Sequence, residues 1–161
     1  MNKNIIRIFI IVLLLDQFSK SFITSFMELE ESILILPFFD LSYIHNYGVA
    51  FGMFDHQLPI IMITTAIAAV LIYKFAFSFK RNMRNDIAFG FLIGGMMGNL
   101  IDRIFYGYVI DFLDFDIFGY DFAVFNLADT FVVIGCLLLM YAIIKGEDTN
   151  GNKSKREREN W

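Results

Sequence analysis

The sequence predicts an all-α polytopic membrane protein with four transmembrane helices and a small β-containing segment between the first two. Of its 161 residues 57% are hydrophobic, and the mean hydropathy is +0.59, which is too apolar for a soluble domain of this length. Four apolar runs are each close to the roughly 20 residues that cross a bilayer as a helix. Lys and Arg are absent from two of the connections between these runs.

The predicted spans are residues 5–26, 58–77, 87–105 and 122–144. We therefore expect residues 1–145 to form one membrane domain, followed by a polar tail at 146–161. The first run lacks a small-x-small cleavage site after its apolar part, so it is interpreted as a span and not as a cleaved signal peptide. The chain has a single cysteine, Cys136, and hence no intramolecular disulfide.

The distribution of Lys and Arg predicts the topology. Basic residues occur at the N-terminus, in the loop after the second span and in the tail, whereas residues 28–57 and 106–121 contain none. Since cytoplasmic segments carry the excess of Lys and Arg, both termini are expected in the cytoplasm. The two connections without Lys or Arg are then extracytoplasmic.

The first of these connections has β-strand character. Residues 33–36 form a short apolar run that ends at Pro37, and residues 41–44 form a second β-prone run. A small sheet on the membrane surface would fit this pattern.

The third span carries a stripe of small residues. Gly90, Gly94, Gly98 and Asp102 recur every four residues and so share one helix face, which would let another helix approach closely. Gly95, Asn99 and Arg103 form the neighbouring stripe. At the start of the fourth span, Asn126 and Asp129 are three residues apart and are expected on one face of a second helix that packs along the stripe.

Charged residues at or near the edges of spans are functional candidates, because an ionisable group is costly in a membrane. Asp16 and Lys20, one turn apart in the first span, are expected to form a structural ion pair. Asp102, Asp111 and Asp129 lie near the predicted outer ends of the third and fourth spans. The spacing alone leaves open which two of these three would act together.

Two carboxylates held close together favour a state in which one is protonated and the other is ionised. Such a pair can remove a proton from water and donate one to a carbonyl, as an aspartic hydrolase requires. No serine or cysteine nucleophile with a histidine partner is apparent. The two histidines, His45 and His56, have no ligand cluster around them, so neither a metal nor another cofactor is expected.

Five motifs follow one another along the chain: DQFSK at 16–20, NYGVAF at 46–51, GGMMGNLIDR at 94–103, VIDF at 109–112 and FNLAD at 125–129. In sequence and order they resemble the motifs of the bacterial lipoprotein signal peptidases, signal peptidase II. The resemblance extends from Asp16 to Asp129 and leaves out only the termini. Each motif alone is moderately specific, and the five together are highly specific.

This resemblance implies an aspartic endopeptidase of the bacterial cytoplasmic membrane, active at the extracytoplasmic face. Its partners would be membrane lipids and diacylglyceryl-modified prolipoproteins, which it would cut on the N-terminal side of the lipidated cysteine. The resemblance makes Asp111 and Asp129 the catalytic pair. It implies that the following residues bind substrate or support the pair: Asn46, Gly48, Asn99, Asp102, Arg103, Asn126 and Ala128. Asp16, Lys20, Gly94 and Gly98 would be structural.

Other classes of protein fit less well. A small proton-coupled transporter or channel also carries intramembrane aspartates, but it needs polar groups at several depths, and the second span has almost none. A scaffold that dimerises through the glycine stripe would leave Asn126 and Asp129 without a role. A presenilin-like protease is disfavoured because no Gly-x-Gly-Asp occurs within a span. A monomer that binds no nucleic acid is expected.

Overall fold

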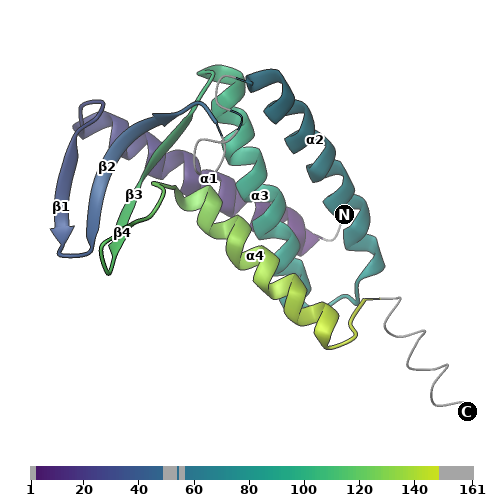
Figure 1. The fold of residues 1–161 in the computed structure, drawn as a ribbon. Helices are drawn as coiled ribbons and strands as arrows, with labels where there is room; N and C mark the ends of the chain where they lie inside the picture. Colours follow the sequence, from purple (N-terminus) through teal and green to yellow (C-terminus); the bar gives the residue numbers. More distant parts are fainter. Residues whose placement is uncertain (1–2, 49–53, 55–56, 149–161) are drawn as a thin grey trace, which may run out of the picture.

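The computed structural model describes residues 3–48, 54 and 57–148, so residues 149–161 of the predicted polar tail and His56 lie outside its described residues. The helices are α1 (Lys3–Phe26), α2 (Leu58–Phe75), α3 (Met83–Phe105) and α4 (Leu127–Ile144), with a 3-10 turn at Ala76–Ser78 after α2. The strands are β1 (Ser32–Leu36), β2 (Phe39–Asn46), β3 (Val109–Ile117) and β4 (Tyr120–Asp121). The helices form a bundle with the sheet at one end (Figure 1).

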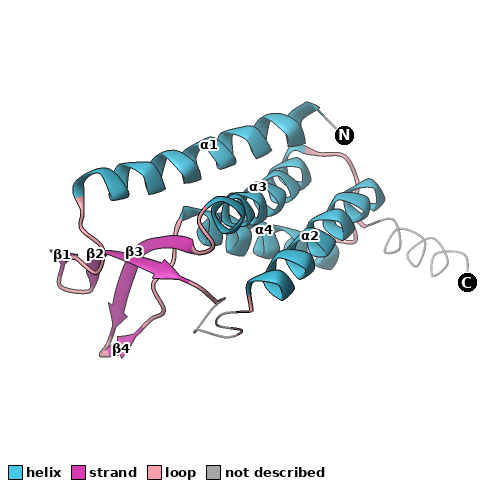
Figure 2. Ribbon diagram, turned by 90° about the horizontal axis from the view of Figure 1, so that it is seen from above, coloured by secondary structure: helices cyan, strands magenta, loops and turns pink. Residues whose placement is uncertain are grey.

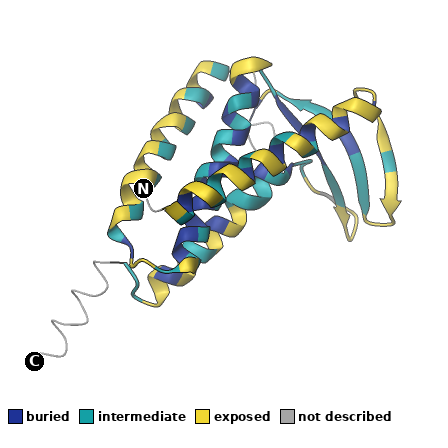
Figure 3. Cartoon of the chain, turned by 180° about the vertical axis from the view of Figure 1, so that it is seen from behind, coloured by how far each residue is buried: buried dark blue, intermediate teal, exposed yellow. Residues whose placement is uncertain are grey.

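The structure is mostly helical, as predicted, and three of its helical segments are long and apolar enough to cross a membrane: Leu58–Ser78, Met83–Phe105 and Leu127–Ile144. The placement of α1 as a fourth span stays a prediction. α3 is the centre of the bundle, because it contacts α1, α2 and α4. α2 contacts the bundle through α3 and is otherwise largely exposed (Figures 2 and 3).

Glycines of α3 allow two different helices, α1 and α4, to pack closely against it. A Cβ on Gly94 would lie 2.7 Å from Val12 Cγ1 of α1, and Gly90 faces the same helix. Gly95 lies against the Ala128 carbonyl of α4 instead. The expectation that α4 packs along the whole 90–94–98 stripe is therefore wrong: α1 occupies most of that stripe, and α4 packs on the adjacent one. Only at Gly98 do both helices come close.

The β-structure is larger than the sequence predicted. A four-stranded antiparallel sheet has the order β1-β2-β3-β4, and two of its strands come from the second connection, where no strand was expected. The all-α description is thus corrected to a helical bundle with a sheet. Alternation of apolar and acidic residues over 113–117 was the signal that could have revealed β3, since period-two patterning is typical of a strand.

α4 begins at Leu127, later than the predicted start at residue 122. Phe125 pairs with Leu113 of β3 through backbone hydrogen bonds, which keep this part of the chain extended. Asn126 then caps the helix. β3 also connects the sheet to the bundle, because Ile110 and Phe112 pack against Ile23 and Met27 at the end of α1. Asp111, between them in sequence, is left on the opposite face of the strand.

Candidate active site

Asp111 is fixed by two amide side chains. It is 1% exposed on β3, where Asn46 Nδ2 donates to its Oδ2 at 2.8 Å and Asn126 Nδ2 donates to its Oδ1 at 2.6 Å. The Gly48 backbone N–H donates to Asn46 Oδ1 at 2.9 Å. That contact orients the Asn46 amide so that its N–H faces the carboxylate.

Asp129 is held in the first turn of α4. The Asp129 N–H donates to Asn126 Oδ1 at 3.1 Å, while the Asn126 N–H donates to Asp129 Oδ2 at 3.2 Å, which completes a capping box. Asn99 Nδ2 of α3 donates to Asp129 Oδ1 at 2.8 Å. Each oxygen of both carboxylates therefore accepts one hydrogen bond from an amide N–H.

Asn126 joins the two aspartates. Its Oδ1 accepts from the Asp129 backbone and its Nδ2 donates to Asp111, so a single side chain binds both groups. Asn126 Nδ2 also lies 3.1 Å from Asn99 Oδ1. A completely buried amide with partners on all sides has little freedom to rotate, so it fixes the relative position of the aspartates.

A second layer of charged groups lies behind the pair. Lys20 Nζ contacts Asp16 Oδ2 at 2.9 Å, Asp102 Oδ2 at 2.7 Å and Asn99 Oδ1 at 2.8 Å. The predicted pair of Asp16 and Lys20 is present, but Lys20 also holds the amide that binds Asp129.

The two acids of this layer bind the backbone next to each aspartate of the pair. Asp16 Oδ1 accepts from the Ala128 N–H at 3.0 Å, one residue before Asp129. Asp102 Oδ2 lies 3.4 Å from the Ile110 N–H, one residue before Asp111. Lys20 therefore connects the supports of both aspartates. We name Asp16, Lys20 and Asp102 the supporting triad.

The pair opens onto one cavity of about 580 Å³ between the sheet, α2, α3 and α4. Asp111, Asp129, Asn46, Asn99 and Arg103 contribute polar atoms to walls that are otherwise mainly apolar. Arg103 donates from Nη2 to the Gly48 carbonyl at 2.6 Å, and its buried Nε has no hydrogen-bond partner within the described structure. The cavity thus combines mainly apolar walls, two carboxylates and a cation whose Nε has no partner among the described residues.

Burial, together with the nearby charge of Asp129, raises the pKa of Asp111 to about 7, although the hydrogen bonds from the Asn46 and Asn126 amides act to lower it. Around neutral pH a substantial fraction of this carboxyl is therefore protonated. A carboxylic acid next to a carboxylate is the arrangement needed for general acid and base catalysis of hydrolysis.

Of the two histidines considered as metal ligands, only His45 lies within the described residues. The His45 ring stacks on Tyr108 with 3.6 Å between centroids, and its Nε2 is 2.9 Å from the Tyr43 hydroxyl. Among the described residues no group of three or more His, Cys, Asp or Glu could hold a metal ion.

Comparison with known proteins gives this geometry a family. The family model described as signal peptidase (SPase) II matches residues 8–145, which is most of the chain. The chain belongs to the signal peptidase II family. The resemblance found in the motifs is thereby confirmed, and the protein is a protease.

Relatives named lipoprotein signal peptidase occur in several bacteria. The one from Wigglesworthia glossinidia brevipalpis is 39% identical over 137 residues, which are 83% of this chain and 90% of the relative. The one from Staphylococcus aureus strain JH9 is 36% identical over 152 residues, which are 93% and 92% of the two chains.

The fold has solved counterparts. Two structures titled as a bacterial membrane enzyme are each 33% identical to this chain and cover 90% of it, with TM-scores of 0.82 and 0.80. The matched regions are 90% and 95% of the two solved chains, respectively. This signal peptidase II chain is therefore a bacterial membrane protein.

The residues singled out in the sequence fall into three groups within this signal peptidase II fold. Asn46, Asn99, Arg103, Asp111 and Asp129 line the cavity, and Gly48 and Asn126 bind these residues from behind. Asp16, Lys20, Asp102 and Ala128 are fully buried behind the pair. Gly94 and Gly98 make helix contacts.

Gln17 is a residue that the sequence reasoning did not single out. Its Nε2 donates to Asp102 Oδ1 at 2.9 Å and lies 3.2 Å from Asp16 Oδ2, so it joins the two acids of the supporting triad. An amide next to Asp16 inside an apolar run was the available signal.

Proposed function

We propose that this protein removes the signal peptide from diacylglyceryl-modified prolipoproteins, cutting on the N-terminal side of the lipidated cysteine, with Asp111 and Asp129 as the catalytic pair. The observation that carries the proposal is that these aspartates, from a strand and a helix, are both bound by Asn126 and both line the same cavity. The family membership supplies the reaction class.

In the proposed mechanism one aspartate is ionised and takes a proton from a water molecule in the cavity. The other is protonated and donates its proton to the carbonyl oxygen of the scissile peptide bond as water attacks the carbonyl carbon. The raised pKa of Asp111 suits it to the acid role at neutral pH. When the tetrahedral intermediate breaks down, the aspartate that took a proton from water gives it to the leaving amine, and the other aspartate takes back its proton as the carbonyl re-forms.

Other groups would position the substrate. Arg103 Nε, which has no partner among the described residues, would donate a hydrogen bond to a peptide carbonyl of the substrate. The apolar walls of the cavity suit the hydrophobic part of a signal peptide. A lipid-modified cysteine stays at the bilayer surface, which reduces the freedom of the scissile bond before reaction.

The direct test is incubation of the purified protein with a synthetic diacylated prolipoprotein, with products identified by mass spectrometry. We expect a single cut before the lipidated cysteine. A matched substrate without the lipid should be cut much more slowly. A cut elsewhere, or equal cleavage of both substrates, would contradict the proposed specificity.

We further propose four transmembrane helices, with both termini in the cytoplasm, the sheet outside, and a monomer as the functional unit. Single cysteines in place of Asp40 and Asp116, in a Cys136→Ala background, should react with an impermeant thiol reagent in intact cells. Reaction only after permeabilisation would reverse the topology and move the aspartate pair to the cytoplasmic side.

A further inference from the structure

The turn between β3 and β4 contains a residue that its backbone conformation disfavours. Phe118 and Gly119 form the two-residue turn, with φ of 56° and 78° respectively. Two-residue hairpin turns of this kind favour Asn or Asp followed by Gly, because both residues are left-handed. Gly119 follows the rule, and its N–H donates to Asp116 Oδ1 at 2.7 Å. Phe118 breaks the rule.

Phe118 gains nothing from packing in the isolated protein, since its side chain is fully exposed. A large apolar residue that is both strained and exposed has no explanation in the stability of the fold. Positions where a local rule is broken without a structural gain are candidates for function.

A second turn lies beside the first. Phe38, in the turn between β1 and β2, accepts a hydrogen bond at its carbonyl from the Asp116 N–H at 3.2 Å, so both turns lie at the same end of the sheet. In Figure 1 this end is the lower end of the strands. Several large apolar side chains are exposed there: Leu36, Phe38, Ile117, Phe118 and Tyr120. We name these five residues the sheet tip.

Charge indicates what covers the sheet tip. Residues 28–57 and 106–121 contain no Lys or Arg and several acids, so the sheet would repel a second copy of itself and would not attract anionic headgroups. The tip is also continuous with the membrane-spanning part, because the chain runs directly from Tyr120 past the exposed Phe122 to the start of α4. The apolar part of a lipid leaflet fits such a surface.

We propose that the sheet tip inserts into the bilayer and anchors the sheet to it, with Phe118 as its deepest side chain. This inference goes beyond peptide cleavage and does not depend on which aspartates are catalytic. Its consequence for catalysis rests on the proposed function. β3, anchored at Phe118, would hold Asp111 at the depth where a lipid-anchored substrate presents its scissile bond.

The test uses the full-length protein in vesicles of phosphatidylcholine brominated on the acyl chains. The only native tryptophan, Trp161, is replaced by Phe, and a single tryptophan is introduced as Phe118→Trp. The matched control is Glu30→Trp, because Glu30 is also exposed and left-handed, with φ of 68°, but lies at the opposite end of the sheet. We expect severalfold stronger quenching at position 118 than at position 30.

Equal quenching at the two positions, or none at position 118, would overturn the proposal. Loss of quenching at position 118 as the protein-to-lipid ratio rises, together with cross-linking between copies, would assign the sheet tip to self-association. That result would also overturn the proposal. Neither outcome bears on the cleavage assay, so failure of this proposal is distinguishable from failure of the proposed function.

Phe118→Asn provides a second measurement. Asn suits the left-handed turn, so this variant should unfold at a higher temperature in detergent than the native protein. Cleavage of lipidated substrate should be unchanged in micelles and reduced severalfold in vesicles. An equal loss in both media would indicate that Phe118 contacts substrate and would contradict anchoring, as would full activity in vesicles.

Discussion

The two ends of the helix bundle each hold a cluster of charged and amide side chains, but the clusters differ in burial. At the sheet end, the side chains of Lys20, Asp16 and Asp102 are at most 2% exposed. At the opposite end, Arg84 and Glu147 form an ion pair whose side chains are 31% and 20% exposed. Ion pairs in water contribute little, whereas burying charges carries a large desolvation cost.

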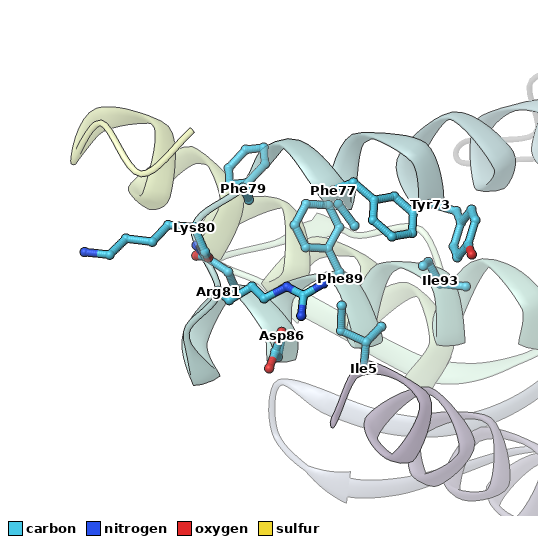
Figure 4. A pocket seen from close by; sticks show the side chains of 11 residues that line it. Ile5, Tyr73, Phe77, Phe79, Lys80, Arg81, Asp86, Phe89 and Ile93 are labelled. Atoms are coloured by element: carbon cyan, nitrogen blue, oxygen red, sulfur yellow. The ribbon is translucent and has the colours of Figure 1, made fainter. Parts of the chain in front are cut away.

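The cluster at the opposite end has a local task. Glu147 accepts from Asn82 Nδ2 at 2.8 Å and pairs with Arg84, which ties the end of α4 to the start of α3. The neighbouring cleft is lined by aromatic rings, with the Arg81 side chain extending over Asp86 (Figure 4). These contacts join adjacent chain ends, and nothing about them requires full burial.

The supporting triad has a different position. It connects α1 to α3, to α4 and to β3, and it binds the backbone beside each aspartate of the pair. The triad of charges that fixes the geometry of the site is almost completely buried, whereas the Arg84–Glu147 pair that joins α3 to the end of α4 stays partly exposed.

The largest expected effect is on the aspartate pair. Asp111→Asn and Asp129→Asn keep the side-chain size but remove proton exchange, so turnover of lipidated substrate should fall by about 10²–10⁴-fold. Because the two act as a unit, the double variant should be hardly slower than either single one. Asp114→Asn on the same strand is the control and should remain active. An active Asp111→Asn enzyme would show that another carboxylate pairs with Asp129.

Next in size is the removal of the buried cation. Lys20→Met leaves Asp16 and Asp102 without their partner, and breaking a buried pair in this way costs about 3–5 kcal/mol. Denaturation in detergent should reveal this loss, and kcat should fall more than KM rises because Asn99 is released from its position. A fully stable and active Lys20→Met protein would contradict the role of the supporting triad in holding the aspartate pair.

The pH dependence of stability tests the burial of Asp111. Its pKa is raised in the folded protein from 3.8 to about 7, so its contribution to stability is full below about pH 4 and is lost as the pH rises through 7. Asp111→Asn should therefore be more stable than the native protein at pH 8, and this advantage should shrink towards pH 4. Turnover should also decline above about pH 7, and a pH-independent difference in stability would contradict the assignment.

The smallest effect is expected at the opposite end of the bundle. The pKa of Glu147 is lowered by its hydrogen bond with Arg84, so the pair stabilises the fold above pH 4.5 and loses this effect as the pH falls. Glu147→Gln should lower the melting temperature far less than Lys20→Met, and added salt should reduce the difference. Its kcat should equal that of the native protein. A large loss of activity would link this end to the site.

Much of the fold could be predicted from the sequence. Long apolar runs, Lys and Arg placement and the five motifs led to the helices and to the family, because each is a local pattern that needs no partner to be recognised. The capping pair of Asn126 and Asp129 is also local. Asn126 was expected inside a helix that starts at residue 122, but it is the N-cap of α4, which begins at Leu127.

Partners distant in the chain could not be read in this way. The sequence placed the glycines of α3 on helix faces but could not say that α1 would occupy most of the 90–94–98 stripe, with α4 packing at Gly95 and beside Gly98. Small residues permit close approach by any helix, so the choice depends on the packing of all the helices together.

By itself the sequence determined that this chain is a membrane protein of the signal peptidase II family and which carboxylates are candidates for its chemistry. The tertiary structure decided that β3 carries Asp111, that Asn126 binds both aspartates, and that Lys20 joins their supports. Hydrogen bonds between residues such as Lys20 and Asn99, 79 positions apart, exist only after distant segments pack. Before this packing, Asn126 cannot bind both aspartates, and Asp111 lacks the burial that raises its pKa.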